Sequence, residues 1–247
     1  MDVAGARGHV VLLHGLGRSP ASLKFAECRL RHAGFSTLNI GYPSRHAPLE
    51  TLAEMVAEQV PARLPGRVHF LTHSMGGIVL RQVLKTNRPQ NLGRVVMLGP
   101  PNRGSRLATR LKDGWIYRSI MGPAGQQIGS DRDSVPNVLG AVDFELGVIA
   151  GTNAIDPCRL LVPGDGDGKV GVDETRVEGM TDWLCLPRGH AFLIIDPTVI
   201  DQAIHFFRVG RFAHPHATAK PSRPTRPDLS AVARSAKVEG PSPPARA

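Results

Sequence analysis

The sequence has few cysteines, and their arrangement excludes two common kinds of small protein. Only three occur in 247 residues, Cys28, Cys158 and Cys185, and no two of them form a CxxC pair. An odd and sparse set argues against a disulfide framework and is typical of a reducing compartment. Structural zinc sites need closely spaced ligands, so we expect no bound metal, and we expect no organic cofactor either.

Long hydrophobic runs are also missing. No apolar stretch approaches the roughly 20 residues that a transmembrane helix needs. The first residues, Met1–Gly8, lack the basic and then apolar order of a secretory signal peptide. With 41% hydrophobic and 21% charged residues, the composition is that of an ordinary globular protein. We therefore expect a folded, cytoplasmic protein.

Positive charge is in excess, and much of it lies near the C-terminal end. The formal net charge is +9. Residues 214–247 hold six Lys or Arg against two Asp or Glu, a net +4, which leaves +5 for residues 1–213. The C-terminal segment is also rich in Pro, Ala and Ser, a composition typical of disorder. We expect one folded domain, 1–213, and a disordered basic tail, 214–247.

A basic chain raises the question of nucleic-acid and membrane partners. The sequence has no recognition-helix pattern and no basic motif interleaved with aromatic residues, so no nucleic-acid partner is expected. The basic tail leaves weak contact with an anionic membrane surface open. Nothing in the sequence indicates the oligomeric state.

Short apolar runs alternate with amphipathic helical patterns along the first 213 residues. Six runs are typical of strands: His9–Leu13, Phe35–Ile40, Arg67–Thr72, Leu92–Leu98, Leu146–Ala150 and Asp182–Leu186. Helical patterns cover Ala21–His32, Leu49–Leu64, Met75–Lys85 and a last helix that begins at Asp196–Pro197. This alternation predicts an α/β fold with about six mainly parallel strands and helices on both faces of the sheet. In such sheets functional groups gather at the carboxyl ends of the strands.

The least regular segment of the domain, Pro100–Asp143, lies between the fourth and fifth predicted strands. It is rich in Gly and Pro, and a connection of this length is often a functional insertion. Its apolar residues Trp115, Ile116 and Tyr117 are expected to contact the substrate, although covering the core is an equally good interpretation. The segment is too short for a large hinged lid.

The strongest chemical signal is Thr72-His-Ser-Met-Gly-Gly77, between a predicted strand and a predicted helix. A serine on such a turn has a strained backbone and an exposed hydroxyl, an arrangement known as the nucleophile elbow. The turn needs small neighbours, which Gly76 and Gly77 supply, whereas Thr72 stands where glycine is commoner. We interpret Ser74 as the candidate nucleophile, and we expect the side chain of His73 to point away from it.

A nucleophilic serine that attacks a carbonyl group also needs two backbone N–H groups to bind the oxyanion. His14-Gly-Leu-Gly17 ends the first predicted strand, and its glycines let this loop fold close to the serine. The expected donors are the amides of Leu16 and Met75. His14 is expected to brace the loop rather than to act as a base.

A histidine and a carboxylate complete the set. His190, in Pro187-Arg-Gly-His-Ala-Phe192, lies between the last predicted strand and the last predicted helix. Asp165 and Asp167, in the glycine-rich turn 163–170, compete as the carboxylate that would fix the tautomer of this histidine. The order Ser, Asp, His along the chain is that of the α/β hydrolases.

Together these motifs resemble the small bacterial lipase/esterase branch of the α/β hydrolases, which includes the minimal Bacillus-type lipases and the lipase class 2-like proteins. The resemblance covers roughly residues 8–212. It rests on five separated blocks: Val11–Gly17, Thr72–Ile78, Leu98–Ser105, Asp167–Val170 and Gly189–Phe192. In such proteins the triad acid heads an Asp-Gly-x-Val block, so the resemblance favours Asp167 over Asp165. It implies a triad of Ser74, Asp167 and His190, with Leu16 and Met75 as oxyanion donors.

The resemblance further implies an acyl-ester or lipid substrate and an acyl-enzyme intermediate. Thioesterases, amidases and acyltransferases use the same triad, so the motifs leave these activities open. A relative without activity would act as a binding protein, but a complete set of serine, acid, histidine and oxyanion loop favours an enzyme.

Overall fold

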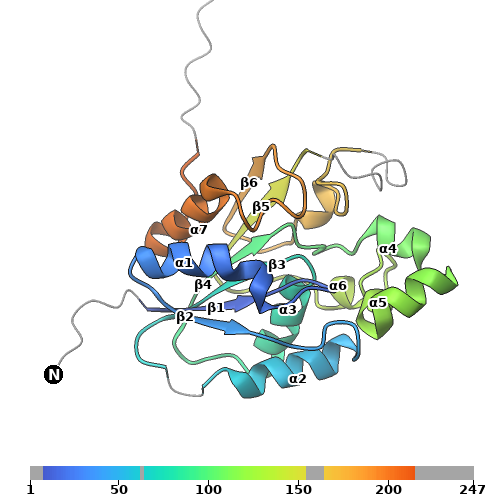
Figure 1. Ribbon diagram of the computed structural model, residues 1–247, viewed down its shortest axis with the longest axis horizontal. Coiled ribbons are helices and arrows are strands. Elements are labelled where there is room, and N and C mark those ends of the chain that lie inside the picture. Colours follow the sequence, from blue (N-terminus) through green and yellow to red (C-terminus); the bar gives the residue numbers. More distant parts are fainter. Residues whose placement is uncertain (1–7, 62–63, 154–163, 215–247) are drawn as a thin grey trace, which may run out of the picture. The chain divides into compact units, whose positions relative to one another are not determined.

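The computed structural model describes residues 8–61, 64–153 and 164–214 (Figure 1). By its internal contacts the chain divides into two units, Met1–Ala213 and His214–Ala247. Apart from His214, the second unit lies outside the described residues, and so does the disorder predicted for it. No helix of the described part is long and apolar enough to cross a membrane.

Six parallel strands form one sheet in the described part of the first unit, as the alternating pattern predicts. They are β1 (His9–Leu13), β2 (Ser36–Ile40), β3 (Val68–His73), β4 (Leu92–Leu98), β5 (Leu146–Gly151) and β6 (Asp182–Leu186). Their order across the sheet is β2-β1-β3-β4-β5-β6. The chain therefore runs from β1 to the edge strand β2 and returns to β3 on the other side of β1. Open α/β sheets bind ligands beyond the carboxyl ends of the strands at such a reversal.

Helices cover both faces of this sheet (Figure 1). On one face lie α1 (Lys24–His32), which follows a 3₁₀ turn at Pro20–Leu23, and α7 (Pro197–Val209). On the other face lie α2 (Leu49–Gln59) and α3 (Gly76–Thr86). The α/β architecture predicted from the sequence is thus confirmed.

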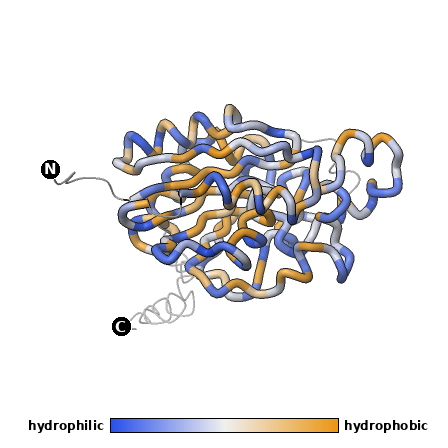
Figure 2. The backbone as a smooth tube through the Cα atoms, turned by 90° about the horizontal axis from the view of Figure 1, so that it is seen from below, coloured by the Kyte–Doolittle hydropathy of each residue, from blue (hydrophilic) through white to orange (hydrophobic). Residues whose placement is uncertain are grey.

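Alternate residues of the central strands supply the two cores. In β1, Val10 and Leu12 pack toward α1 and α7, whereas Val11 and Leu13 pack toward α2 and α3. Strands that are buried on both faces are mostly apolar, which is why the sequence shows them as near-continuous runs. Figure 2 shows these hydrophobic stretches running through the middle of the unit.

One predicted helix is longer than the helix in the structure. The pattern over Leu49–Leu64 predicts a continuous helix, but α2 ends at Gln59. The cause is Pro61, whose ring disfavours helical backbone at the preceding residue. Val60 accordingly adopts an extended conformation, with φ −83° and ψ 111°.

The segment Pro100–Asp143 is more regular than its composition suggests. It holds three helices, α4 (Arg106–Leu111), α5 (Trp115–Gln127) and α6 (Val135–Val138). The sequence conceals α5 because Gly122 and Pro123 interrupt its pattern. Gly122 has φ 65° and ψ −169°, which breaks the helix, and Pro123 begins its second part. A side chain at position 122 would collide with the carbonyl oxygen of Arg45, so the kink fits α5 closely against the loop after β2.

His69 of β3 is a buried histidine in the core beside α7. Its ring centroid lies 5.9 Å from that of Phe35 and 5.2 Å from that of Phe207. Its Nδ1 accepts a hydrogen bond of 2.9 Å from the amide of Arg94. Burial, helped by the positive charges of Arg94 and Arg67, lowers the pKa of His69 to about 4. The folded protein therefore holds this ring in its neutral form.

The stability of the protein should depend on the charge of His69. In an unfolded chain the pKa of histidine is about 6.5, so the stabilising contribution of the neutral ring is complete above that pH and is lost as the pH falls toward 4. The variant His69→Asn keeps a side-chain oxygen that can accept the hydrogen bond from the Arg94 amide, but it has no ring to protonate. Between pH 7 and pH 4 the wild type should lose on the order of 2–3 kcal/mol more free energy of unfolding than this variant. Urea denaturation across this range measures the difference. Parallel pH profiles for the two proteins would contradict the role of His69.

Candidate active site

Ser74 lies in the turn between β3 and α3, where its φ is 54°. It is the one non-glycine residue with a positive φ among the described residues. An L-amino acid adopts this conformation only at a cost, and such strain is typical of functional sites. Its amide donates a hydrogen bond of 2.9 Å to the carbonyl oxygen of Leu98, which ties the turn to the end of β4. Ser74 lines a cavity of about 330 Å³.

Close backbone contacts make this turn possible. A Cβ atom on Gly76 would lie 2.7 Å from the carbonyl oxygens of both Leu13 and His14. A Cβ atom on Gly15 would lie 3.0 Å from the Cβ atom of Ser74. A side chain at Gly76 would collide with backbone oxygens, and one at Gly15 would make unusually tight contacts, so the end of β1 and the turn after β3 pack closely together.

Thr72 stands where such turns more often have glycine, and the structure shows how it is accommodated. Its side chain is fully buried, and its Oγ1 atom has no hydrogen-bond partner. A Cβ atom on Gly77 would lie 3.3 Å from this oxygen. Because Gly77 has no side chain, the turn has room for the side chain of Thr72.

Asp167 and His190 form a buried pair. Nδ1 of His190 lies 2.7 Å from Oδ2 of Asp167. The other carboxylate oxygen accepts the amides of Lys169 and Val170, both at 2.9 Å, and the amide of His190 itself donates to the backbone carbonyl of Asp167 at 2.9 Å. A carboxylate accepts at both oxygens, so the ring proton is held on Nδ1 and Nε2 is left as an acceptor. His190 lines the same cavity as Ser74.

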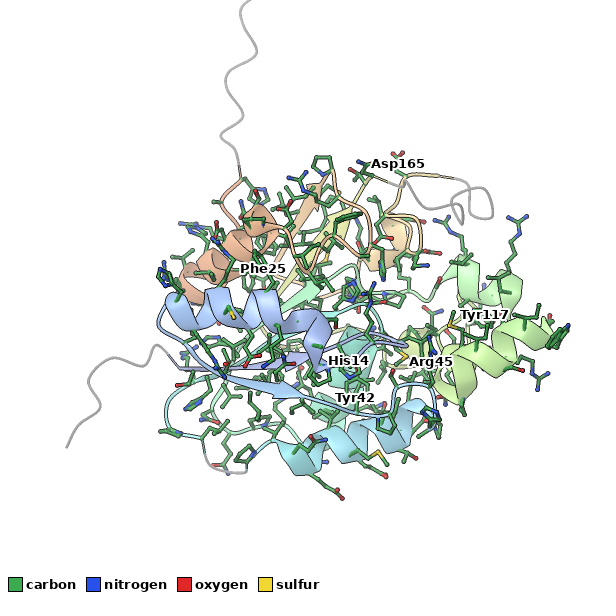
Figure 3. All side chains as sticks on the ribbon, viewed as in Figure 1. His14, Phe25, Tyr42, Arg45, Tyr117 and Asp165 are labelled. Atoms are coloured by element: carbon green, nitrogen blue, oxygen red, sulfur yellow. The ribbon has the colours of Figure 1, made fainter. Side chains whose placement is uncertain are left out.

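The two candidate acids are clearly separated by the fold. Asp167 is only 1% exposed and contacts His190. Asp165 is exposed, and Figure 3 shows it at the outside of the unit. Its backbone carbonyl accepts the amide of Val172 at 2.9 Å, which fixes the turn. The geometry therefore brings Asp167, and not Asp165, to the histidine.

Two glycines to which the motifs assign no role, Gly99 within the block Leu98–Ser105 and Gly151 outside the blocks, make room for this pair. A Cβ atom on Gly99, which has φ 55°, would lie 2.9 Å from Oδ2 of Asp167 and 3.3 Å from Nδ1 of His190. A Cβ atom on Gly151 would lie 2.7 Å from Cβ of Asp167. Gly99 follows β4 and Gly151 ends β5. A glycine at the carboxyl end of each of two neighbouring strands is the signal in the sequence that would have revealed them.

The loop after β1 is held by His14 and Tyr42. The His14 ring stacks on the Tyr42 ring at 4.2 Å, and its Nδ1 donates to the carbonyl oxygen of Gly15 at 3.0 Å. The Tyr42 hydroxyl donates to the carbonyl oxygen of His14. A trans peptide directs its N–H away from its C=O, so the bond to Gly15 also sets the direction of the Leu16 amide. Burial lowers the pKa of His14, which keeps its ring neutral. His14 thus braces the loop, as expected, whereas Tyr42 was not foreseen.

The second expected oxyanion donor belongs to the residue after the serine. Met75 is the N-cap of α3, and its side chain is fully buried. The first amides of a helix have no acceptor within the helix, and its dipole places partial positive charge at this end. Leu16 lines the cavity beside Ser74, so the segments that carry both expected donors flank the serine.

The expectation that His73 points away from the site is wrong. Its ring lies 4.7 Å from the ring of His190, and its Nε2 donates to the His190 carbonyl oxygen at 3.1 Å. Burial lowers the pKa of His73 well below the usual range, and neighbouring His190 lowers it further. His73 follows Leu71 on the face of β3 that packs toward α7, and the loop with His190 lies on the same face. His73 therefore contacts His190 and lines the same cavity.

The three apolar residues expected to contact substrate lie in different surroundings. Tyr117 lines the cavity, as does Met121 one helical turn later. Trp115 and Ile116 are 77% and 54% exposed and do not line the cavity, so the structure does not bring these two side chains to Ser74. They begin α5 on its solvent side. The Tyr117 hydroxyl donates to the carbonyl oxygen of Gly125 at 3.2 Å, and burial raises the pKa of Tyr117 to about 12.

The comparison with known families agrees with this geometry. The model of the alpha/beta hydrolase family matches residues 10–226. The chain belongs to this family. No curated protein sequence shows significant similarity to this α/β hydrolase. Among its described residues, no group of three or more His, Cys, Asp or Glu is arranged to hold a metal ion.

Solved structures share the fold of this α/β hydrolase at low sequence identity. The mature lipase BlEst2 from Bacillus licheniformis has a TM-score of 0.61 and 18% identity over 85% of this chain and 93% of that chain. A thermophilic esterase from Thermogutta terrifontis has a TM-score of 0.54 and 17% identity over 81% and 89%. The phospholipase PlaB from Legionella pneumophila has a TM-score of 0.54 and 18% identity over 68% of this chain but 45% of that chain. At such identities the likeness shows the fold alone.

The stacking and hydrogen bond between Tyr42 and His14, called the clamp here, hold the loop after β1 and should control the reactivity of Ser74. Tyr42→Phe leaves the buried carbonyl oxygen of His14 without its donor, which should cost about 1–2 kcal/mol of unfolding free energy. Since phosphonylation of a serine uses the same oxyanion donors as attack on an ester, we expect labelling by a fluorophosphonate probe to slow by about tenfold. The matched control is Phe206→Leu, which also lowers the free energy of unfolding, by loosening the core beside α7, but leaves the contacts of the loop after β1 in place. Equal labelling rates in the wild type and Tyr42→Phe would contradict the clamp.

Proposed function

We propose that this α/β hydrolase is a serine hydrolase that cleaves carboxylic esters through Ser74, Asp167 and His190. One observation carries the proposal: the buried contact of 2.7 Å between Asp167 and His190 lies behind a cavity that Ser74 and His190 both line. The strained backbone of Ser74, at φ 54°, supports its assignment as nucleophile.

In the proposed mechanism, His190 acts first as base and then as acid. Its Nε2 takes the proton of Ser74 as the hydroxyl oxygen attacks the ester carbonyl carbon. Asp167 keeps the other ring proton on Nδ1 and stabilises the imidazolium. The amides of Leu16 and Met75 bind the negative oxygen of the tetrahedral intermediate. His190 then returns the proton to the leaving alcohol, and an acyl group remains on Ser74.

Water completes the reaction by the same groups in reverse. His190 removes a proton from the water as its oxygen attacks the acyl carbon, and a second oxyanion forms against the same two amides. Collapse of this intermediate releases the carboxylic acid and returns the proton to Ser74. This route requires no metal ion or organic cofactor.

The surroundings of Ser74 support an acyl-ester or lipid substrate. Much of the cavity lining is apolar and includes Leu107, Ala108, Tyr117, Met121, Ile128 and Val170. We place the protein in the small bacterial lipase/esterase branch of the family, on the motifs that it shares with that branch. A lipase and an esterase share the fold at 18% and 17% identity, so this assignment rests on the sequence motifs.

Hydrolysis of p-nitrophenyl esters, from acetate to palmitate, tests the nucleophile. We expect the wild type to hydrolyse at least one ester and Ser74→Ala to lose at least about three orders of magnitude in kcat, because the mutant cannot form the acyl-enzyme. The acyl-length profile then distinguishes an esterase from a lipase. Turnover by Ser74→Ala at the wild-type rate would contradict the proposal.

A matched pair of variants tests the acid. Asp167→Asn keeps the shape of the side chain but can present an N–H to Nδ1 of His190, which favours the wrong tautomer. We expect kcat to fall by about three to four orders of magnitude. Asp165→Asn removes the same charge from the same turn and should leave kcat within about twofold. The opposite result would make Asp165 the acid of the triad.

A further inference from the structure

The rim of the cavity carries positive charge that the proposed ester chemistry does not use. Arg18, Arg45 and Lys169 line the cavity together with Ser74. Of the described residues that line it, none is an aspartate or a glutamate. Asp167 lies behind His190 and is 1% exposed. These three exposed cationic residues, called the rim here, differ chemically from the buried and half-buried apolar residues that line the same cavity.

Arg45 lies directly on the loop that carries the expected oxyanion donor. A Cβ atom on Gly17 would lie 2.5 Å from Nη2 and 2.7 Å from Nε of Arg45, so the guanidinium packs against the backbone one residue beyond Leu16. The amide of Gly17 donates to Oγ of Ser44 at 3.0 Å, which fixes this part of the loop. Figure 3 shows Arg45 between His14 and Tyr117, and Tyr117 of α5 lines the same cavity as Arg45.

Arg18 follows Gly17 directly, on the loop after β1. Both arginines are exposed, and among the described residues neither has a carboxylate partner. Other arginines of the described part do pair with carboxylates, for example Arg29 with Asp201. Two cations beside a cavity without acidic residues attract anions, and a guanidinium matches the geometry of a carboxylate or a phosphate.

We propose that Arg18 and Arg45 make this protein selective for esters that carry a negative charge, as a carboxylate or a phosphate. The charged group would bind at the rim while the apolar part of the substrate contacts Tyr117 and Met121. This inference rests on the proposed function, since it specifies the substrate of the same site. Both arginines act in specificity, and neither takes part in the transfer of the acyl group or the proton.

Two pairs of esters, matched except in charge, test the inference. The carboxylate arm compares mono-p-nitrophenyl glutarate with p-nitrophenyl pentanoate, which has the same number of acyl carbons. The phosphate arm compares butyrylglycerol phosphate with butyrylglycerol. We expect kcat/KM to favour the charged ester in at least one arm, and the preference to weaken as salt is added. The arm that shows it identifies the anion.

Substitution of the arginines shows whether they cause the preference. In the double variant Arg18→Gln, Arg45→Gln, the ratio of kcat/KM for the charged ester to that for the neutral ester should fall by about tenfold or more, because charge-assisted hydrogen bonds are lost. The control Arg211→Gln also removes one positive charge, but it lies after the end of α7, near the amino ends of the strands and away from the cavity. It should leave the ratio unchanged. Equal or higher kcat/KM for the neutral ester in both arms would overturn the inference, as would an undiminished ratio in the double variant.

A binding measurement separates failure of this inference from failure of the proposed function. On Ser74→Ala, calorimetry with the same glutarate and pentanoate esters, and with the two butyryl compounds, measures affinity without turnover. We expect Ser74→Ala to bind a charged ester more tightly than its neutral partner. The triple variant that also carries Arg18→Gln and Arg45→Gln should lose this difference in affinity. If the wild type hydrolyses no ester, the proposed function fails, and this difference in affinity still decides the charge preference.

Discussion

A serine held at a positive φ between β3 and α3 is the constraint on which the rest of the site depends. Such a conformation costs about 1–3 kcal/mol and persists only where the surroundings fix it. Here β3 lies between β1 and β4, and its residues are buried on both faces. The close packing at Gly15 and Gly76 holds the turn against the end of β1. The cores above and below the sheet therefore supply the stability that holds Ser74 in place.

The neighbours of β3 deliver the other parts of the site to the same edge of the sheet. The loop after β1 brings Leu16, braced by His14 and Tyr42. Beyond β4 and β5, two glycines leave the space that Asp167 and His190 fill. The carboxyl ends of parallel strands lie at one edge of the sheet, so residues far apart in the sequence meet there. The strand ends, rather than long loops, determine where these residues lie.

The part of this arrangement that depends on local pattern can be predicted from the sequence. Strands buried on both faces are continuous apolar runs, and the order β1-α1-β2-α2-β3-α3 follows from their alternation with helical patterns. The motif around Ser74 is local as well, because its glycines are needed within three residues of the serine. What depends on tertiary contact is not visible: the stack of His14 on Tyr42, and the turn of His73 toward His190. The helix α5 is hidden for a different reason, since Gly122 and Pro123 break its pattern while the loop at Arg45 accepts the kink.

The measurement that tests the central assignment most directly is the mass of the protein during turnover. The wild type is mixed with p-nitrophenyl pentanoate, quenched in acid within the first turnovers, and examined by intact-mass and peptide-mapping spectrometry, with Ser74→Ala alongside. We expect a pentanoyl group on the peptide that contains Ser74, on that serine, and none on the variant. A p-nitrophenol burst stoichiometric with the enzyme but without an acyl group on Ser74 would contradict Ser74 as the nucleophile. An acyl group that forms on another residue of Ser74→Ala during turnover at the wild-type rate would also contradict it.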